Sequence, residues 1–285
     1  MTTAPNYFRQ NNILDSLPAA DYERLFPHIE RVKIARGEIL YEPGDVMNYA
    51  YFPLTCIMSL ISTMKNGNSS EIALVGNEGM VGIALFMDGA ISPNRVIVRS
   101  AGYAYRIERH LVTQEFNRFG GRRQGAFHNL LLRYTQVMIA QMTQMAVCNR
   151  HHALDQQLCR WLLLSLDRLV SNELLMTHEL IANMLGVRRE GVSEAAGKLQ
   201  RAGLIYYNRG HITVLDRPGL EARACECYQI IKRESDRLLP ILDQSLTSLN
   251  RFIIEKASVR HEHIKGHEHI KMSAQTGADI QGARM

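Results

Sequence analysis

The sequence lacks the features that would place it in a membrane or send it out of the cell. No apolar run reaches the roughly 18 residues needed to cross a bilayer. The most apolar stretch, 161–166, is followed at once by Asp167 and Arg168. The first residues lack the basic and then apolar order of a secretory signal. We therefore expect a cytoplasmic protein with no membrane partner.

Cysteine is scarce, with five residues in 285. The odd number and the scatter argue against a disulfide framework and favour reduced thiols. Cys225 and Cys227 form the only close pair. A C-x-C pair in a helix could bind a metal or respond to oxidants, but on its own it is a weak signal. We expect inert thiols, no metal site and no cofactor.

Motifs for catalysis are missing too. The chain has no H-E-x-x-H motif and no convincing pair of nucleophile and base, so we expect no enzyme and no catalytic residues. The segments 261–265 and 267–271 repeat His-Glu-His-Ile-Lys. Four histidines in nine residues could bind Zn²⁺ or Ni²⁺ weakly, but the polar sequence after them favours a mobile tail.

The net charge of +5 favours a polyanionic partner without naming one.

Residues 31–110 have the pattern of many short strands joined by glycine-bearing turns. The β-branched run 56–64 and the run 70–75 flank Asn66-Gly67, a pair that supplies the positive φ values of a tight hairpin turn. Two further strands are expected at 96–101 and 103–107. Such a series predicts a β-roll or barrel.

After Gly120-Gly121 the sequence becomes helical for about thirty residues. Its apolar residues form a seam that a single helix cannot bury against itself, which predicts a helix that pairs with a second copy of the chain. The alternative is a long core helix lying on its own domain. The two seam positions hold Leu131, Met138 and Met145, and Tyr134, Gln141 and Cys148.

Residues 177–201 carry the pattern of a helix-turn-helix. Thr177 is placed to cap the first helix. Ala182 is small enough for two helices to cross closely, and Gly186 stands in the turn, where only glycine adopts the conformation cheaply. Apolar residues occupy every position that should hold the pair against a core: Ile181, Leu185, Val187, Val192 and Ala195.

A second helix is expected from about 188 to 202, ending at Gly203. The run 204–207 then pairs across a turn with 211–215, which makes a β-hairpin wing with Arg209 at its tip. Asp216 caps a further helix that we expect to continue to Leu239 and stop at Pro240.

The start of the second helix is where a helix-turn-helix enters the major groove. Arg189 could contact guanine through two hydrogen bonds, and Glu190 could accept one from cytosine. Ser193 is the third candidate base reader. The alternative is that these are only solvated polar groups. The residues expected to position DNA phosphates are Thr177, Arg188, Lys198 and Arg209.

With these motifs the chain resembles the Crp/Fnr family over residues 10–235, most specifically over 180–215, where 189–193 reads Arg-Glu-x-Val-Ser. The resemblance implies an α+β fold with an N-terminal β-roll (a double-stranded β-helix like that of cyclic-nucleotide-binding domains), a long dimerisation helix and a C-terminal winged helix-turn-helix. It also implies a homodimer on a palindromic site in double-stranded DNA, with RNA polymerase as a partner if the protein is an activator. The family often has arginine where Glu194 stands.

On this basis the expected domains are a sensor at 1–120, a dimerisation helix at 121–150 and a winged helix-turn-helix at 151–217. A helical extension at 218–257 and a flexible histidine-containing tail at 258–285 follow.

The sensor departs from the relatives that bind cyclic nucleotides. The stretch 81–86 corresponds to their phosphate cassette, but Ile83 replaces the glutamate that accepts from ribose, and Val96 replaces the small residue after Arg95. Unpaired ribose hydroxyls would cost about 1–3 kcal/mol each, so we do not expect cyclic AMP to be the effector. Gly82 and Arg95 remain as a candidate pocket for another anion.

Two other chemistries find little support. The iron–sulfur relatives use cysteines near the N-terminus, and no cysteine precedes Cys56 here. A ligand-binding module that acts on a protein partner would suit the β-roll but would leave 177–215 unexplained. The sequence therefore predicts a DNA-binding transcription regulator whose signal it does not specify.

Overall fold

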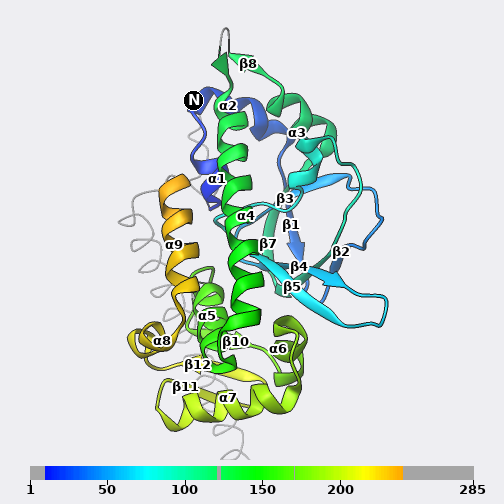
Figure 1. Ribbon diagram of the computed structural model, residues 1–285. Helices are drawn as coiled ribbons and strands as arrows, with labels where there is room; N and C mark the ends of the chain where they lie inside the picture. The colour runs from blue at the N-terminus through cyan, green and yellow to red at the C-terminus, as the bar shows by residue number, and fades with distance from the viewer. Residues whose placement is uncertain (1–9, 121–122, 170, 240–285) are drawn as a thin grey trace, which may run out of the picture. The chain divides into compact units, whose positions relative to one another are not determined.

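The computed structural model describes residues 10–120, 123–169 and 171–239 (Figure 1). The chain divides into a unit of residues 1–240 and a unit of residues 241–285, and every described residue belongs to the first. Within the described part, no helix is both long and apolar enough to cross a membrane. The amphipathic stretch expected up to 257 and the histidine tail at 258–285 lie outside the described residues.

Short helices precede the β-roll: α1 (Asn12–Asp15), α2 (Ala19–Leu25) and the 3-10 helix η2 (Phe26–His28). Asn11 caps α1, because its side-chain oxygen accepts from the backbone N–H of Ile13 at 3.1 Å. Its amide nitrogen donates to the carbonyls of Pro53 at 3.0 Å and Gly79 at 2.8 Å. A buried asparagine thus fixes α1 to the end of β3 and to the loop after β5.

The β-roll consists of two antiparallel sheets, of strand order β1-β7-β3 and β2-β6-β4-β5. The expected hairpin is confirmed, since β4 and β5 pair across a turn in which Gly67 has a φ of 85°. The apolar side chains between the sheets form the first core. The strands are β1 (Glu30–Ile34), β2 (Ile39–Tyr41), β3 (Tyr49–Pro53), β4 (Ile57–Thr63), β5 (Ser69–Val75), β6 (Arg95–Ser100) and β7 (Gly102–Glu108).

A short helix α3 (Arg109–Phe116) and the two-residue strands β8 (Phe119–Gly120) and β9 (Arg123–Gln124) lead into the long helix α4 (Ala126–His151). The prediction that the seam of α4 pairs with a second copy of the chain is wrong. All six of its residues are buried within the single chain, where α4 packs against β5 and α9, as the alternative of a core helix requires. The apolar residues that α4 leaves exposed lie on another face and are Leu132, Ile139 and Val147.

The winged helix-turn-helix is confirmed with its expected elements, together with one strand that the sequence did not indicate. That strand, β10, pairs with the wing to give a sheet of order β10-β12-β11. Its three residues, Glu-Leu-Leu, are too short for an alternating pattern to stand out. The elements are α5 (Leu154–Leu166), β10 (Glu173–Leu175), α6 (His178–Leu185), α7 (Arg189–Arg201), β11 (Ile205–Asn208) and β12 (His211–Val214).

The single helix expected from Asp216 to Leu239 is wrong. The structure has two helices, α8 (Arg217–Arg223) and α9 (Glu226–Leu238), with extended backbone at Ala224 and Cys225 between them. The break lets the chain turn, so that α9 runs alongside α4 (Figure 1). It also brings Cys225 and Cys227 into contact with the last turn of α4.

Candidate nucleic-acid interface and sensor site

The pair α6 and α7 is held by the residues that define a helix-turn-helix. The Thr177 hydroxyl accepts from the N–H of Leu180 at 3.3 Å and caps α6. Gly186 ends α6 in the left-handed conformation, with a φ of 67°, which a side chain would strain. Ala182 and Val192 are buried at 2% and 0% exposure. The local sequence therefore fixes the angle at which α7 leaves the turn.

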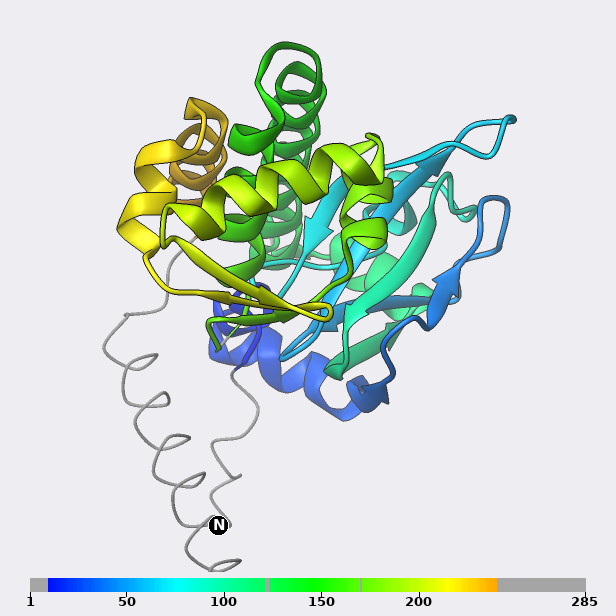
Figure 2. The same cartoon turned by 90° about the horizontal axis from the view of Figure 1, so that it is seen from below.

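α7 has one buried and one exposed face. Val192, Ala195, Ala196 and Leu199 pack into the second core. Viewed from below, α7 lies at the surface with no described element over it (Figure 2). Its outward side chains, together with the residue before it, are Arg188, Arg189, Glu190, Ser193, Glu194 and Lys198, all exposed.

The exposed Ser193 hydroxyl already has two hydrogen-bond partners within the protein. It donates to the carbonyl of Arg189 at 3.1 Å and lies 2.9 Å from Nδ1 of His178. The His178 ring stacks on Tyr207 of the wing, with the ring centres 4.0 Å apart. Burial, and then the charge of Arg189, lower the pKa of His178. Sequence reasoning missed His178, whose contacts join α6, α7 and the wing.

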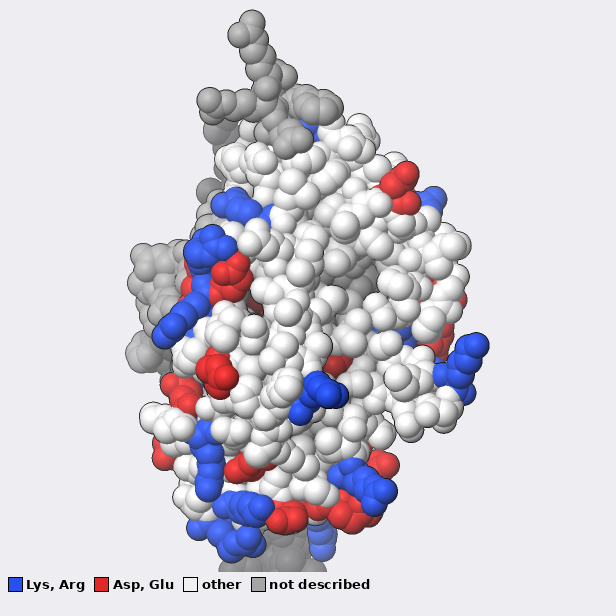
Figure 3. Space-filling model, in the orientation of Figure 1, with Lys and Arg blue, Asp and Glu red and all other residues white. Residues whose placement is uncertain are grey.

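Lys198 and Glu194 pair with each other on the exposed face of α7, with 2.8 Å between Nζ and Oε1. The hydrogen bond from Lys198 lowers the pKa of Glu194. Positive and negative side chains lie together at this end of the molecule, in the lower part of Figure 3, where α7 runs. The positive charge offered by Lys198 is thus partly neutralised within its own helix.

The backbone conformation of two residues determines where the tip of the wing lies. Arg209 is exposed and has a φ of 46°, and Gly210 follows with a φ of 86°. The N–H of Tyr207 donates to Oε1 of Gln200 at 2.9 Å, so that the wing is tied to α7. Arg209 therefore stands at a defined turn, apart from the α7 side chains.

In the sensor, the expected cassette is a 3-10 helix, η3 (Ile83–Met87), which Gly82 precedes with a φ of 112°. A Cβ on Gly82 would lie 3.1 Å from Leu85. Arg95 forms an ion pair with Glu42, with 2.8 Å between Nε and Oε2. Both side chains are about 40% exposed, at 40% and 39%. Arg95 thus already has an anionic partner.

A cavity of about 460 Å³ lies between η3 and α3. Its lining includes Asp88, Arg109 and His110, and it includes neither Gly82 nor Arg95. The two residues chosen from the sequence as an effector pocket are therefore not the ones that line this hollow.

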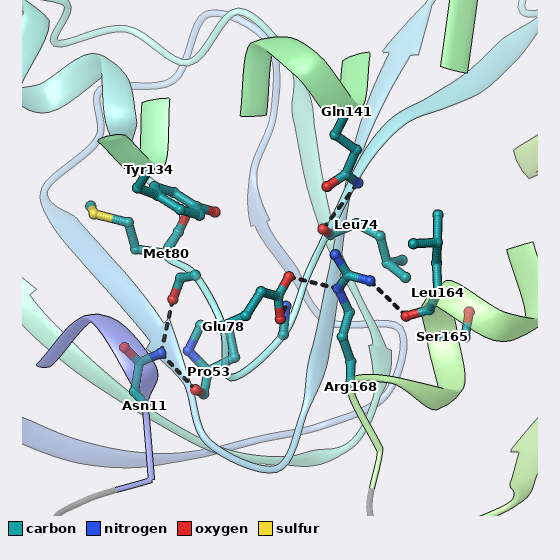
Figure 4. A network of polar contacts seen from close by, with 12 residues as sticks. Asn11, Pro53, Leu74, Glu78, Met80, Tyr134, Gln141, Leu164, Ser165 and Arg168 are labelled. Carbon is teal, nitrogen blue, oxygen red and sulfur yellow. Dashed lines mark hydrogen bonds and ion pairs between the residues drawn. The ribbon is translucent and has the colours of Figure 1, made fainter. Parts of the chain in front are cut away.

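The end of β5 and the loop after it join the sensor to the helices that lead to the DNA-binding domain (Figure 4). Nε2 of Gln141 donates to the carbonyl of Leu74 at 3.2 Å, and the Tyr134 hydroxyl donates to the carbonyl of Met80 at 2.9 Å. Nε of Arg168, after α5, is 2.6 Å from Oε1 of Glu78. No sequence motif indicated these contacts.

A buried polar group lies beside this loop. The Glu71 carboxylate of β5 accepts from the Ser59 hydroxyl at 2.5 Å and from the Trp161 indole at 3.1 Å. Nε of Arg99 donates to Ser59 Oγ at 3.2 Å. Burial raises the pKa of Glu71 against the opposing effects of Ser59, Arg99 and Arg160. A sensor carboxylate is therefore held by a residue of α5.

Comparison with known proteins agrees with this arrangement. Residues 31–119 match the model of the cyclic nucleotide-binding domain, and residues 156–223 match that of the Crp-like helix-turn-helix domain. The chain is 25% identical over 238 residues to the transcriptional regulatory protein btr of Bordetella pertussis, covering 77% of this chain and 88% of that protein.

Solved structures share the fold. A Crp/Fnr regulator from Eubacterium rectale superposes with a TM-score of 0.58 at 17% identity, over 74% of this chain and 96% of that one. FixK2 from Bradyrhizobium japonicum gives a TM-score of 0.57 at 15% identity, over 69% and 98%. With both domain models matched in this order, the chain belongs to the Crp/Fnr family of transcription regulators, with a sensor domain and a helix-turn-helix DNA-binding domain.

Proposed function

We propose that the protein acts in the cytoplasm as a homodimer that recognises a palindromic operator through α7 of each copy. The observation that carries the proposal is the uncovered first turn of α7, where Arg188, Arg189 and Glu190 are all exposed. A two-fold dimer presents two such helices to successive major grooves, which matches a palindrome. Dimers and palindromic operators are typical of the family.

The dimer contact that we propose is the exposed apolar face of α4. Leu132, Ile139 and Val147 are 46%, 59% and 44% exposed, and their spacings of seven and eight residues place them on one side of the helix. The surface over α4 carries few charged side chains (Figure 3). An apolar stripe of this period on an exposed helix favours pairing with a second helix.

In the complex that we propose, Arg189 and Glu190 read bases from the first turn of α7. Ser193 reads a base only after it exchanges its contact with His178 for one with DNA. Four other residues contact phosphates and set the position of the helix without reading sequence. They are Thr177, Arg188, Lys198 and Arg209.

For the sensor, we propose an effector other than cyclic AMP. Ile83 offers no acceptor for a ribose hydroxyl, and Val96 is 2% exposed and apolar. An anion bound near Gly82 and Arg95 would have to compete with Glu42 for the guanidinium. The proposal includes contact with RNA polymerase only where the protein activates a promoter.

The test is a gel-shift titration of the full chain against a pool of genomic fragments, followed by the selected site. Arg189→Ala and Glu190→Ala should each cost about 1–3 kcal/mol on that site and relax its sequence preference. Lys198→Ala should weaken binding to all sequences alike. Lys33→Ala, an exposed lysine of the β-roll, is the matched control and should change nothing. Unchanged selectivity in Arg189→Ala and Glu190→Ala, with the dimer intact, would refute the assignment of base readers.

A further inference from the structure

Four metal-ligand side chains meet where the end of α4 contacts the start of α9. Cys148 and His152 come from the last turn and the end of α4, Cys225 comes from the break between α8 and α9, and Cys227 comes from the first turn of α9. Their ligand atoms all lie within 4.8 Å of one another. The three cysteines are at most 3% exposed. Cys148 and Cys225 are 77 residues apart in the sequence, so only the folded chain brings them together.

The distances suit one tetrahedral ion. Cys148 Sγ and Cys225 Sγ are 3.4 Å apart, and Cys227 Sγ is 3.5 Å from Nδ1 of His152. Zinc bonds of about 2.3 Å to sulfur and about 2.0–2.1 Å to nitrogen place tetrahedral ligands about 3.5–3.8 Å apart. The four ligand atoms therefore need only small shifts to enclose a single ion.

The second nitrogen of His152 also has a suitable partner. Nε2 lies 3.2 Å from Oε1 of Glu226. A carboxylate on the outer nitrogen of a metal-binding histidine fixes the ring and selects the tautomer that offers the other nitrogen to the metal. Here that leaves Nδ1 free to face the three sulfurs.

An independent observation is the state of Arg160, which is completely buried in α5. Its three guanidinium nitrogens have no hydrogen-bond partner among the described residues. A buried cation needs a compensating charge. Arg160 lies close enough to Cys148 and Cys227, as well as to Glu71, for its charge to act on them. Three thiolates around one Zn²⁺ carry a net charge of about −1, which Arg160 would balance.

We propose that Cys148, His152, Cys225 and Cys227 bind one Zn²⁺ ion. The site has four protein ligands and no open position, so it is a structural site rather than a catalytic one. It fastens the end of α4, directly before the turn into α5, to α9. This proposal replaces the sequence-based expectation of inert thiols and no metal, and it does not depend on which DNA the protein binds.

The first test measures zinc in the full, untagged chain, purified under reducing conditions without chelator. The tail is a confounding site, so the four histidines 261, 263, 267 and 269 are first replaced by alanine. We expect about one zinc per chain in this background. Cys225→Ala should lose it, whereas Cys56→Ala, a buried cysteine of the other core, should retain it. Equal zinc in the two variants would overturn the proposal.

The second test avoids the danger that a variant fails to fold. Metal-free, reduced protein with the same tail substitutions is titrated with Co²⁺. We expect one equivalent to produce thiolate-to-cobalt charge-transfer absorption and the intense visible bands of tetrahedral cobalt, both removed by added Zn²⁺. His152→Cys should keep a four-ligand tetrahedral spectrum, whereas His152→Ala should bind Co²⁺ more weakly and shift the visible bands, because water takes the fourth position. Absence of thiolate absorption in the reduced protein would show that the cysteines bind no metal and would sink the proposal.

Discussion

The indole nitrogen of Trp161 in α5 donates a 3.1 Å hydrogen bond to Glu71 in β5, and both side chains are buried. This contact joins the helix that begins the DNA-binding domain to a strand of the sensor. β5 also contacts α4 and α6. A shift of the β4–β5 hairpin would therefore displace α6, the first helix of the helix-turn-helix. The bond is thus a physical candidate for the coupling between the two domains.

We expect Trp161→Phe to destabilise the protein by about 1–3 kcal/mol, because it leaves one oxygen of a buried carboxylate without its donor. The substitution also removes one ring of the buried indole and leaves a cavity, so the hydrogen bond is isolated only by comparison with a second substitution. Denaturant unfolding of Trp161→Phe, Glu71→Leu and the double variant measures the coupling, because leucine offers the indole no acceptor. Strictly additive effects of the two substitutions would show that the pair does not interact energetically.

Glu71→Gln should change how stability depends on pH. Burial raises the pKa of Glu71 in the folded chain, whereas the unfolded chain keeps the ordinary pKa of about 4.3. The folded state therefore holds the proton more tightly, and the contribution of Glu71 to stability falls as pH rises above about 4.3. The free energy of unfolding of the wild type minus that of Glu71→Gln should decrease with rising pH. A difference that increases instead would mean that the charges of Arg99 and Arg160 lower the pKa of Glu71 by more than burial raises it.

Local patterns in the sequence predicted the elements whose geometry is fixed locally. The turn at Asn66-Gly67 and the turn at Gly186 depend on positive φ values that glycine supplies. The apolar period of residues 177–201 specifies the buried face of α6 and α7. These features depend on neighbours within a few residues, and the structure has them where the sequence indicated.

Contacts between distant segments could not be predicted in this way. The seam of α4 looked unpartnered because the pattern does not reveal that the loop after β5 meets Tyr134, β5 meets Gln141 and Cys225 meets Cys148. The break at Ala224 has no glycine or proline to announce it. Glu71 gave no sign of burial, since its donors come from Ser59 and Trp161. The cysteine and histidine cluster is likewise assembled only by the fold.

Glu194→Gln should strengthen DNA binding a few-fold on all sequences. The substitution removes a negative charge from the face of α7 and releases Lys198 from its 2.8 Å ion pair. Lys198 then contacts phosphate without a competing carboxylate, and the face of α7 is one charge more positive, so the dependence of affinity on salt should become steeper by up to about one unit of slope. Gel-shift titrations at several salt concentrations measure both effects. If only one operator sequence gains affinity, Glu194 contacts a base rather than restraining Lys198.

Ile139→Glu should convert the proposed dimer to monomers. The residue is 59% exposed in the single chain, so the substitution should not disturb folding, but a pair of carboxylates facing each other across a two-fold axis repels. We expect dimer affinity to fall at least tenfold, about 1.4 kcal/mol, as measured by analytical ultracentrifugation. Ile91→Glu, at an isoleucine 58% exposed in the sensor, is the matched control. An unaltered dimer in Ile139→Glu would place the interface elsewhere.

Removal of zinc should destabilise the protein in a way that depends on Cys225. An ion that binds only the folded chain adds about 2.7 kcal/mol when its free concentration is 100 times its Kd. Thermal unfolding of wild type should therefore occur at a lower temperature after chelation and recover on adding Zn²⁺. Cys225→Ala should show neither response, while Cys56→Ala should show both. Because the ion joins α9 to the end of α4, hydrogen exchange should rise after chelation mainly in α9 and in the last turn of α4. Chelation that leaves both segments as protected as before would argue that no metal fastens them.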